Sequence, residues 1–253
     1  MIHGMWGGPW YWEKYRGVFE AQGYRCVAAT LPHHDMDPRG SPDPRLGTTS
    51  LLDYAEALEQ EVKELGAKPI LMGHSMGGLL AQMLGARGLA KALVLLSPAP
   101  PAGIFVLKPS VIRSFWSVQT KWGFWRKPMR QTFDEAVYSM LHRLPEAEQK
   151  EAYASFVYES GRAASEIGYW FLDPKSAARV DESAVTCPML IVAGAEDRIV
   201  PVAVVRKIAK KYEAVATYWE LERHAHWVVA EPGWREIAES VGGWLSSVSS
   251  RTP

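Results

Sequence analysis

Three short stretches of the sequence carry side chains that together could perform nucleophilic catalysis. Ser75 lies in GHSMGG, which fits the pattern G-x-S-x-G. A serine hydroxyl becomes a good nucleophile when a base takes its proton, and a carboxylate must orient that base. His224 and His226 stand one residue apart in RHAHW, and Glu196 and Asp197 follow an apolar run. The residue types alone leave both histidines and both acids open as partners of Ser75.

The segments on either side of Ser75 are typical of a nucleophile held in a sharp turn. PILMG (69–73) is predicted to be an apolar strand, and SMGGLLAQMLGARG is predicted to continue as a helix. Glycines two residues before and after the serine let strand and helix pass closely, and the helix N-terminus offers unpaired N–H groups to an oxyanion. The alternative is an ordinary glycine-rich turn in which Ser75 only caps the helix.

Strand-like and helix-like runs alternate along most of the chain. Strands are predicted at 25–31, 69–73, 92–100 and 188–197 and in ATYWEL, and helices in LLDYAEALEQEVKELG after Thr49 or Ser50, in PVAVVRKIAKKY and from PGWREIAESVGGWL. Apolar strands separated by helices predict a mostly parallel sheet covered on both faces. Residues 101–185 hold half of the 28 aromatic residues and have helical periodicity, so we expect a helical insertion there.

The chain resembles the α/β-hydrolase family in four motifs that occur in the family's order. They are HGMWGG near the start, GHSMGG, GAEDRIVP and HAHWVVAEPGW. The resemblance implies an α/β-hydrolase fold with a helical cap and with shortened N-terminal strands, since only Met1 and Ile2 precede the first motif. It divides the chain into a first part of the core (1–100), a helical lid (101–185) and a second part of the core (186–253).

The resemblance also selects among the acids and histidines. The pattern G-x-x-D before a hydrophobic-Pro helix start places the acid at Asp197, with Glu196 as the second choice. The alternative for Asp197 is a helix cap or an ion pair with Arg198. The family's histidine precedes an apolar or aromatic residue and, a few positions on, an acidic-Pro pair, which in HAHWVVAEP identifies His226 as the base. His224 is then expected in the loop, with contact to substrate or to His226 as the alternative.

The family's HG-x-W loop and the residue after the nucleophile supply the oxyanion hole. By resemblance, these donors are the backbone N–H groups of Met5 and Met76. Aromatic side chains of the insertion and of the loops near the triad are candidates for substrate contacts, although most of them also suit the core of a lid. The candidates are Trp6, Trp116, Trp122, Trp125, Tyr158, Trp170 and Trp227. Their character favours an apolar or aromatic substrate.

Composition excludes several other classes. Lys+Arg and Asp+Glu are equal at 28 each, so the net charge indicates neither a nucleic acid nor an anionic membrane as partner. No apolar run approaches the ~20 residues of a membrane span and no signal peptide opens the chain, so we expect a cytoplasmic protein. Metal binding is not expected. Cys26 and Cys187 are expected to be free thiols. Glu159, Arg162 and Glu166 of the insertion are expected to form ion pairs. The histidine-rich loop, with His33, His34, Asp35 and Asp37, is expected to lack a metal-ligand set.

These patterns predict a serine hydrolase of the carboxylesterase type that needs no cofactor or metal. The expected substrate is a small apolar or aromatic ester, cleaved through an acyl-enzyme by Ser75, His226 and Asp197. The same triad also serves thioesterases, lactonases, amidases, carbon–carbon bond hydrolases and hydroxynitrile lyases, and a non-catalytic small-molecule-binding protein can retain it. Turnover that depends on Ser75 distinguishes an enzyme from such a binding protein. The oligomeric state is left open.

Overall fold

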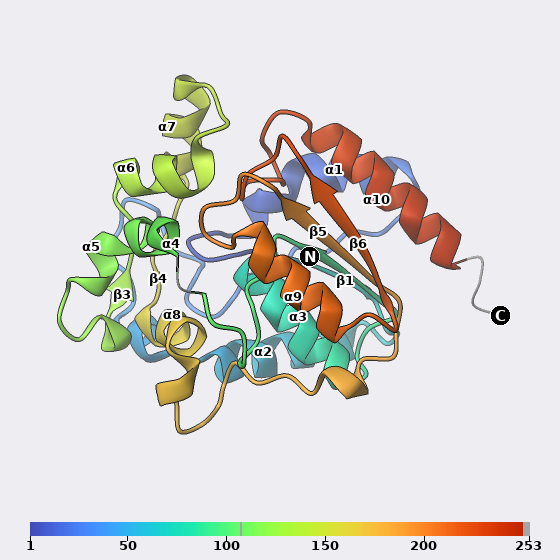
Figure 1. Cartoon of the computed structure of the whole chain (residues 1–253), viewed down its shortest axis with the longest axis horizontal. Helices are drawn as coiled ribbons and strands as arrows, with labels where there is room; N and C mark the ends of the chain where they lie inside the picture. The colour runs from blue at the N-terminus through green and yellow to red at the C-terminus, as the bar shows by residue number, and fades with distance from the viewer. Residues whose placement is uncertain (107, 250–253) are drawn as a thin grey trace.

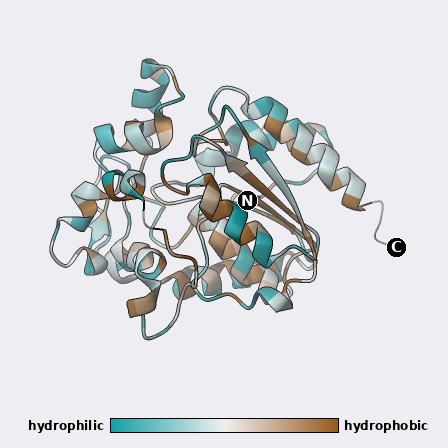
Figure 2. Ribbon diagram, in the orientation of Figure 1, coloured by the Kyte–Doolittle hydropathy of each residue, from teal (hydrophilic) through white to brown (hydrophobic). Residues whose placement is uncertain are grey.

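The centre of the molecule is a four-stranded parallel sheet (Figure 1). The computed structural model describes residues 1–106 and 108–249. The strands lie in the order β1 (Ile70–His74), β2 (Ala92–Leu96), β5 (Met189–Gly194) and β6 (Ala216–Leu221). The continuous buried runs of β2 and β5, of which β5 is brown in Figure 2, suit strands that helices cover on both faces, whereas β6 at the edge of the sheet is partly exposed and less apolar. The predicted strands of the sheet are therefore present, apart from the one expected at residues 25–31.

Helices form a layer on each face of this sheet (Figure 1). One layer holds α2 (Leu51–Glu64), α3 (Met76–Ala86) and α9 (Val202–Lys211), and the other holds α1 (Glu13–Ala21) and α10 (Trp234–Ser249), which contact each other. Two 3-10 turns, η1 (Pro9–Trp12) and η2 (Pro44–Thr48), precede α1 and α2. Of the two candidate caps of α2, Ser50 has this role, because its side chain forms a capping box with Asp53.

The N-terminal segment corrects one prediction. Residues 25–31 were expected to form a buried strand, but they have no regular secondary structure. The backbone of this segment forms two hydrogen bonds with the backbone of Met1: the Met1 amine donates to the Val27 carbonyl at 2.7 Å, and the Ala29 N–H donates to the Met1 carbonyl at 3.0 Å. The Leu31 N–H donates to the His3 ring at 3.4 Å and not to a neighbouring strand. Ile2 in turn forms a single parallel bridge with Gly73. A strand needs a continuous ladder of backbone hydrogen bonds, and the two bonds with Met1 are too few to form one.

Between β2 and β5 the chain leaves the sheet and forms the left-hand part of the molecule in Figure 1. We call residues 101–185 the inserted segment. Its helices and turns are α4 (Pro109–Ser114), α5 (Trp116–Gln119), η3 (Phe124–Arg126), α6 (Phe133–Ala136), the π-helical turn η4 (Val137–Leu141), α7 (Glu146–Ala154), α8 (Gly161–Gly168), η5 (Trp170–Leu172) and η6 (Glu182–Ala184). The helical character matches the prediction. A short antiparallel pair, β3 (Pro128–Met129) with β4 (Glu159–Ser160), was not predicted.

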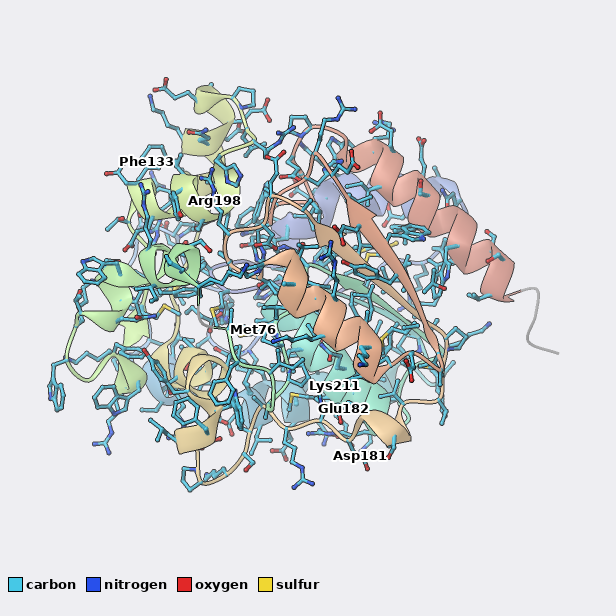
Figure 3. The ribbon with its side chains drawn as sticks, viewed as in Figure 1. Met76, Phe133, Asp181, Glu182, Arg198 and Lys211 are labelled. Carbon is cyan, nitrogen blue, oxygen red and sulfur yellow. The ribbon has the colours of Figure 1, made fainter. Side chains whose placement is uncertain are left out.

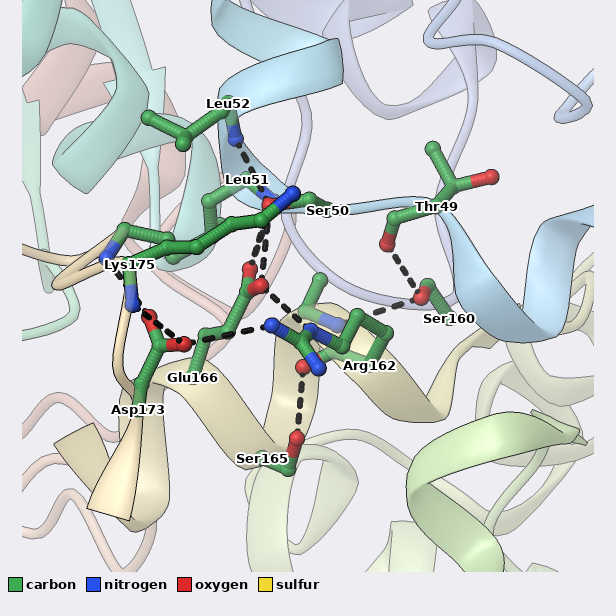
Figure 4. Close-up of polar contacts among 12 residues, drawn as sticks. Thr49, Ser50, Leu51, Leu52, Ser160, Arg162, Ser165, Glu166, Asp173 and Lys175 are labelled. Carbon is green, nitrogen blue, oxygen red and sulfur yellow. Dashed lines mark hydrogen bonds and ion pairs between the residues drawn. The ribbon is translucent and has the colours of Figure 1, made fainter.

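A buried carboxylate on α8 joins the inserted segment to the start of α2 (Figure 4). The Ser50 hydroxyl donates to both oxygens of Glu166 at 2.9 Å, and the Leu51 N–H donates to one of them at 2.8 Å. Arg162 pairs with the same carboxylate at 2.6 Å. Because helix N-terminal N–H groups favour negative charge, Glu166 is well placed there. Arg162 and Glu166 thus form an ion pair, as expected, with a structural role.

A second buried contact joins β4 to the histidine-rich loop. The His34 ring bonds the Glu159 carboxylate at 3.1 Å through Nε2 and the Pro32 carbonyl at 3.1 Å through Nδ1. Both partners are acceptors, so both ring nitrogens donate and His34 is an imidazolium. Burial lowers the pKa of His34, but the charge and hydrogen bond of Glu159 outweigh it, and the pKa lies above its ordinary value. Tyr54 also donates to Glu159 at 2.7 Å.

Replacing Glu159 by glutamine is expected to lower the free energy of unfolding by about 3 kcal/mol, because it leaves a buried imidazolium without a counter-charge. The raised pKa of folded His34 also sets a pH dependence in the wild type. The stabilisation by this pair is complete below the pKa of unfolded histidine and declines as pH rises through the folded value. Urea unfolding at several pH values measures both effects. Glu148→Gln on the exposed surface of α7 is the control, and an equal loss in both variants would contradict the assignment.

Candidate active site

Ser75 lies in a strained turn between β1 and α3. Its backbone has φ 53° and ψ −120°, a conformation that non-glycine residues seldom adopt, and its side chain makes no capping hydrogen bond to α3. A Cβ on Gly73 would lie 2.1 Å from the Gly77 carbonyl oxygen, and a Cβ on Gly77 would lie 2.1 Å from the Ile2 carbonyl oxygen. The glycine spacing is therefore a steric requirement of this turn, and the hydroxyl of Ser75 is not used as a helix cap.

His226 and Asp197 form a buried hydrogen-bonded pair. His226 Nδ1 and Asp197 Oδ2 are 2.7 Å apart, and both side chains are about 1% exposed. The other oxygen of Asp197 accepts the N–H groups of Ile199 and Val200, each at 2.8 Å. Because the carboxylate only accepts, Nδ1 carries the proton and Nε2 keeps a free lone pair. This is the tautomer that a general base needs.

Ser75 and His226 meet at a small cavity. The cavity has a volume of about 10 Å³, and the two side chains line it together with Met5, Trp6, His74, Phe115, Met140 and Ile199. The space is about the smallest that holds one water molecule. The structure thus brings together Ser75, His226 and, through the Nδ1 hydrogen bond, Asp197, although they lie far apart in the sequence.

The two residues predicted to supply the oxyanion hole lie next to Ser75. Met5 and Met76 line, together with Ser75, a second and larger cavity of about 360 Å³, which is described below. Figure 3 shows Met76 where the inserted segment meets the sheet. Met76 is the first residue of α3, so its N–H has no acceptor within the helix. The Met5 loop is held by Tyr11, whose hydroxyl donates to the Met5 carbonyl at 2.9 Å. A Cβ on Gly4 would lie 2.9 Å from the Ser75 Cβ, so this loop passes directly against the serine.

His74 is a further residue of the site, and the sequence reasoning did not identify it. It occupies the variable position before Ser75, is fully buried, and its Nε2 donates to the His226 carbonyl at 2.8 Å. Burial and the neighbouring His226 ring lower the pKa of His74 well below its usual value, so the ring is neutral. His74 therefore ties the end of β1 to the loop that carries His226. The motif gives no signal for this contact, because its partner lies far along the chain.

His224 points to a different partner from His226. Its Nδ1 bonds the buried Glu231 carboxylate at 2.9 Å, and the same oxygen accepts the Ala225 N–H at 2.8 Å. His224 also lines a surface hollow that does not include Ser75. Glu231, the acid of the acidic-Pro pair, thus binds the two residues that precede His226. The expectation that His224 belongs to the loop agrees with this placement.

A cavity of about 360 Å³ opens at Ser75 beneath the inserted segment. Apolar side chains from the core and from the inserted segment line most of it, and none of its lining residues is charged. They include Ile104, Phe105, Val111, Ile112, Phe115, Val118, Phe124, Ile167, Tyr169, Phe171, Ile199 and Val200. A cavity of this size and character suits the hydrocarbon part of a small organic molecule.

The aromatic residues proposed for substrate contact lie mostly elsewhere, which corrects the expectation. Of the seven candidates, only Trp6 lines a cavity with Ser75. Trp122 and Trp125 line a separate hollow of the inserted segment, and Trp227 is buried against Tyr11. Trp116 is 61% exposed, Trp170 packs against Phe105, and Tyr158 is half-buried outside both cavities at Ser75. Composition shows that aromatic residues are abundant, but not which of them face inward.

Other groups considered in the sequence have no arrangement suited to a metal. Within residues 1–106 and 108–249, no three His, Cys, Asp or Glu side chains are placed to hold a metal ion. Cys26 and Cys187 are free, and His33 lies 3.3 Å from Asp43.

No helix in the described part of the chain is long and apolar enough to cross a membrane.

The chain is similar to known proteins in both sequence pattern and fold. The sequence pattern of the Alpha/beta hydrolase family matches residues 1–239, and the chain belongs to this family. Solved structures agree over almost the whole chain, which confirms the predicted fold class. A methylesterase from Arabidopsis has a TM-score of 0.70 at 14% identity, covering 97% of this chain and 98% of that one. A pyrethroid hydrolase from Sphingobium faniae has a TM-score of 0.71 at 17% identity, covering 98% and 97%.

Similarity to curated proteins is higher but covers a short stretch. Salicylic acid-binding protein 2 of Nicotiana tabacum is 35% identical over 81 residues, which are 31% of this chain and 30% of that protein. Methylesterase 8 of Arabidopsis thaliana is also 35% identical over 81 residues, 31% of this chain and 28% of that protein. The matched stretch thus spans less than a third of each of these two relatives. Methylesterase 7 and Methylesterase 3 of Arabidopsis thaliana match over stretches of similar length.

Proposed function

We propose that this protein is a serine hydrolase that cleaves carboxylic esters of small apolar or aromatic acids through an acyl-enzyme. One observation carries the proposal: Ser75, in its positive-φ turn, shares a cavity wall with His226, whose Nδ1 is bonded to Asp197 at 2.7 Å. This placement supports the roles of nucleophile for Ser75, base for His226 and orienting acid for Asp197, which acyl transfer requires. The methylesterases among the relatives support ester hydrolysis as the reaction.

In the first half of the reaction, Ser75 Oγ attacks the ester carbonyl carbon and His226 Nε2 takes the hydroxyl proton. The carbonyl oxygen becomes an oxyanion, which the N–H groups of Met5 and Met76 stabilise. The tetrahedral intermediate then expels the alcohol, whose oxygen receives the proton from His226. Asp197 remains ionised and stabilises the imidazolium.

In the second half, water attacks the acyl-enzyme. His226 Nε2 takes a proton from the water, and a second oxyanion forms at the same two N–H groups. Its collapse releases the carboxylic acid, and His226 returns the proton to Ser75 Oγ. One ester and one water give one acid and one alcohol, and no cofactor takes part in the balance.

The two cavities suggest which part of the ester lies on which side. The larger cavity, of about 360 Å³ and without charged lining residues, suits the acid part. The cavity next to His226, the residue that protonates the leaving alcohol, is only about 10 Å³. We therefore propose a short alcohol such as methanol on this side. In this proposal residues 101–185 act as a lid, since α4, α5 and α8 supply much of the wall of the larger cavity.

The two histidines of RHAHW provide the test. Methyl esters of medium-chain and aryl carboxylic acids are the substrates, and acid release is followed in a pH-stat. Replacing His226 by alanine is expected to lower kcat/KM at least about 10³-fold, because Ser75 then has no base. Replacing His224 by alanine is expected to leave kcat/KM within about tenfold, because His224 contacts Glu231 and not the cavity at Ser75.

The reverse pattern, with His224→Ala inactive and His226→Ala active, would show that the wrong histidine has been assigned. A folded wild type that hydrolyses none of these esters would contradict the proposed reaction. Thermal unfolding of each variant separates loss of chemistry from loss of fold.

A further inference from the structure

Exposed apolar side chains are concentrated on the inserted segment. Among the described residues, nine large hydrophobic side chains are exposed, and seven of them lie between residues 105 and 172. We call these seven the aromatic patch: Phe105, Ile112, Trp116, Trp122, Tyr169, Phe171 and Leu172. Trp122 is 86% exposed and Leu172 is 71% exposed, values far from those of a lid core. Exposed apolar side chains gathered on one part of a surface usually mark a contact site.

Several members of the aromatic patch lie close together. The Phe105 and Phe171 rings are 5.4 Å apart. Tyr169 and Leu172 line the hollow that also contains Trp122. Tyr169 at the same time lines the cavity at Ser75, as do Phe105, Ile112 and Phe171. Four of the seven patch residues therefore also line the proposed substrate cavity.

Basic residues outnumber acidic ones around the patch, where Glu135 bonds to Ser117 and where Glu166 and Asp173, both paired with Arg162, line the hollow that contains Trp122. Residues 105–127 contain Lys108, Arg113, Lys121, Arg126 and Lys127 and no Asp or Glu. All five are exposed, and none has a carboxylate partner in the part of the chain that the structure describes. Lys127 Nζ donates to the backbone carbonyl of Trp122 at 3.1 Å, so this charge lies next to the main chain that carries the most exposed ring of the patch. The balanced net charge of the chain hides this local excess.

We propose that the aromatic patch and these five basic residues dock the protein on the surface of an anionic lipid bilayer. Tryptophan and tyrosine rings prefer the boundary between hydrocarbon and water, and lysine and arginine are attracted to anionic headgroups. A second copy of the chain is disfavoured as occupant, because its patch would bring the same positive charges face to face. Bound in this way, the cavity opening faces the lipid, and apolar esters enter from the bilayer.

Vesicle flotation tests the proposal with two lipid mixtures, phosphatidylcholine alone and phosphatidylcholine with about one third phosphatidylserine. The wild type is expected to bind the anionic vesicles at least about tenfold more strongly, and added salt is expected to weaken this binding. Trp122→Ser is expected to weaken it about tenfold, since an interfacial ring is lost. The double variant Lys121→Gln, Arg126→Gln is expected to weaken it about 25-fold, at about fivefold per charge.

A charge-matched control lies on α9, outside the inserted segment. The double variant Lys207→Gln, Lys210→Gln removes two exposed positive charges that have no ion-pair partner among the described residues, and it is expected to bind anionic vesicles within about twofold of the wild type. All substituted side chains are exposed, so the fold is expected to be kept, and circular dichroism checks this. Ser75→Ala is expected to bind as the wild type does, which separates docking from catalysis.

Three results would overturn the proposal. They are no binding to anionic vesicles, an equal loss of binding in the α9 control and the patch variants, and patch-dependent self-association in solution without vesicle binding. The last result would identify a second copy of the chain as the occupant.

Discussion

Replacement of Ser75 by alanine is expected to lower kcat/KM for methyl ester hydrolysis at least about 10³-fold, and this is one of the two largest effects that we expect. Without Oγ no acyl-enzyme forms, and only the oxyanion donors and the binding cavity remain to assist attack by water. The substitution should not disturb the fold. The Ser75 side chain makes no capping hydrogen bond to α3, and alanine adds no atom to the crowded turn.

Steady-state acid release and thermal unfolding of the same preparations measure this prediction. The unfolding midpoint of Ser75→Ala is expected to equal or slightly exceed that of the wild type. If the variant keeps more than about a tenth of the wild-type kcat/KM, Ser75 is not the nucleophile. The matched control is Ser97→Ala, which removes another buried serine with positive φ, at the end of β2 and outside the two cavities at Ser75.

Replacement of Asp197 by asparagine is expected to lower kcat about 10⁴-fold while the geometry stays intact. Oδ1 of Asp197 accepts two N–H groups, from Ile199 and Val200. An asparagine must keep its carbonyl oxygen on these donors, because its NH₂ group cannot accept them. The NH₂ group then faces His226 Nδ1, which must become the acceptor. The imidazole proton moves to Nε2, and the nitrogen that should take the serine proton already carries one.

Glu196→Gln is the matched control for this prediction. Glu196 is the neighbouring carboxylate, and it pairs with Arg143 at the surface at 3.1 Å rather than with a histidine. Its loss is expected to change kcat less than about threefold, in line with the small value of exposed ion pairs. A comparable loss of kcat in both variants would show that the acid is wrongly assigned. The pH dependence of kcat adds a second readout, since the proton on Nε2 removes the base at every pH.

Local patterns in the sequence predicted several features because their causes are local. Gly73 is required by contacts with residues four and five positions on, and Gly77 by the backbone of Ile2, so the pattern GHSMGG indicates the turn. The sequence limited the N-cap of α2 to Thr49 or Ser50, and the apolar runs of β2 and β5 are long enough to be recognised as buried strands. Fold class and the position of the nucleophile follow from such signals.

Other features arise only when distant segments pack together. The strand expected at residues 25–31 lacks a ladder, because a strand depends on its neighbour as much as on its own sequence. The contact between His74 and the His226 carbonyl joins positions 152 residues apart, and no motif records it. The aromatic residues were abundant in the sequence, but burial decided that aliphatic side chains line most of the cavity while Trp122 stands in solvent.

The sequence by itself therefore determined the α/β architecture, the turn that carries Ser75 and the residues that could assist it. The tertiary structure decided the hydrogen-bond partners of His74 and His224, which aromatic side chains reach the substrate cavity, and which of them remain exposed. The physical reason is the range of the interactions. Steric and capping requirements act within a few residues, whereas hydrogen bonds, burial and surface charge depend on side chains that only the folded chain brings together.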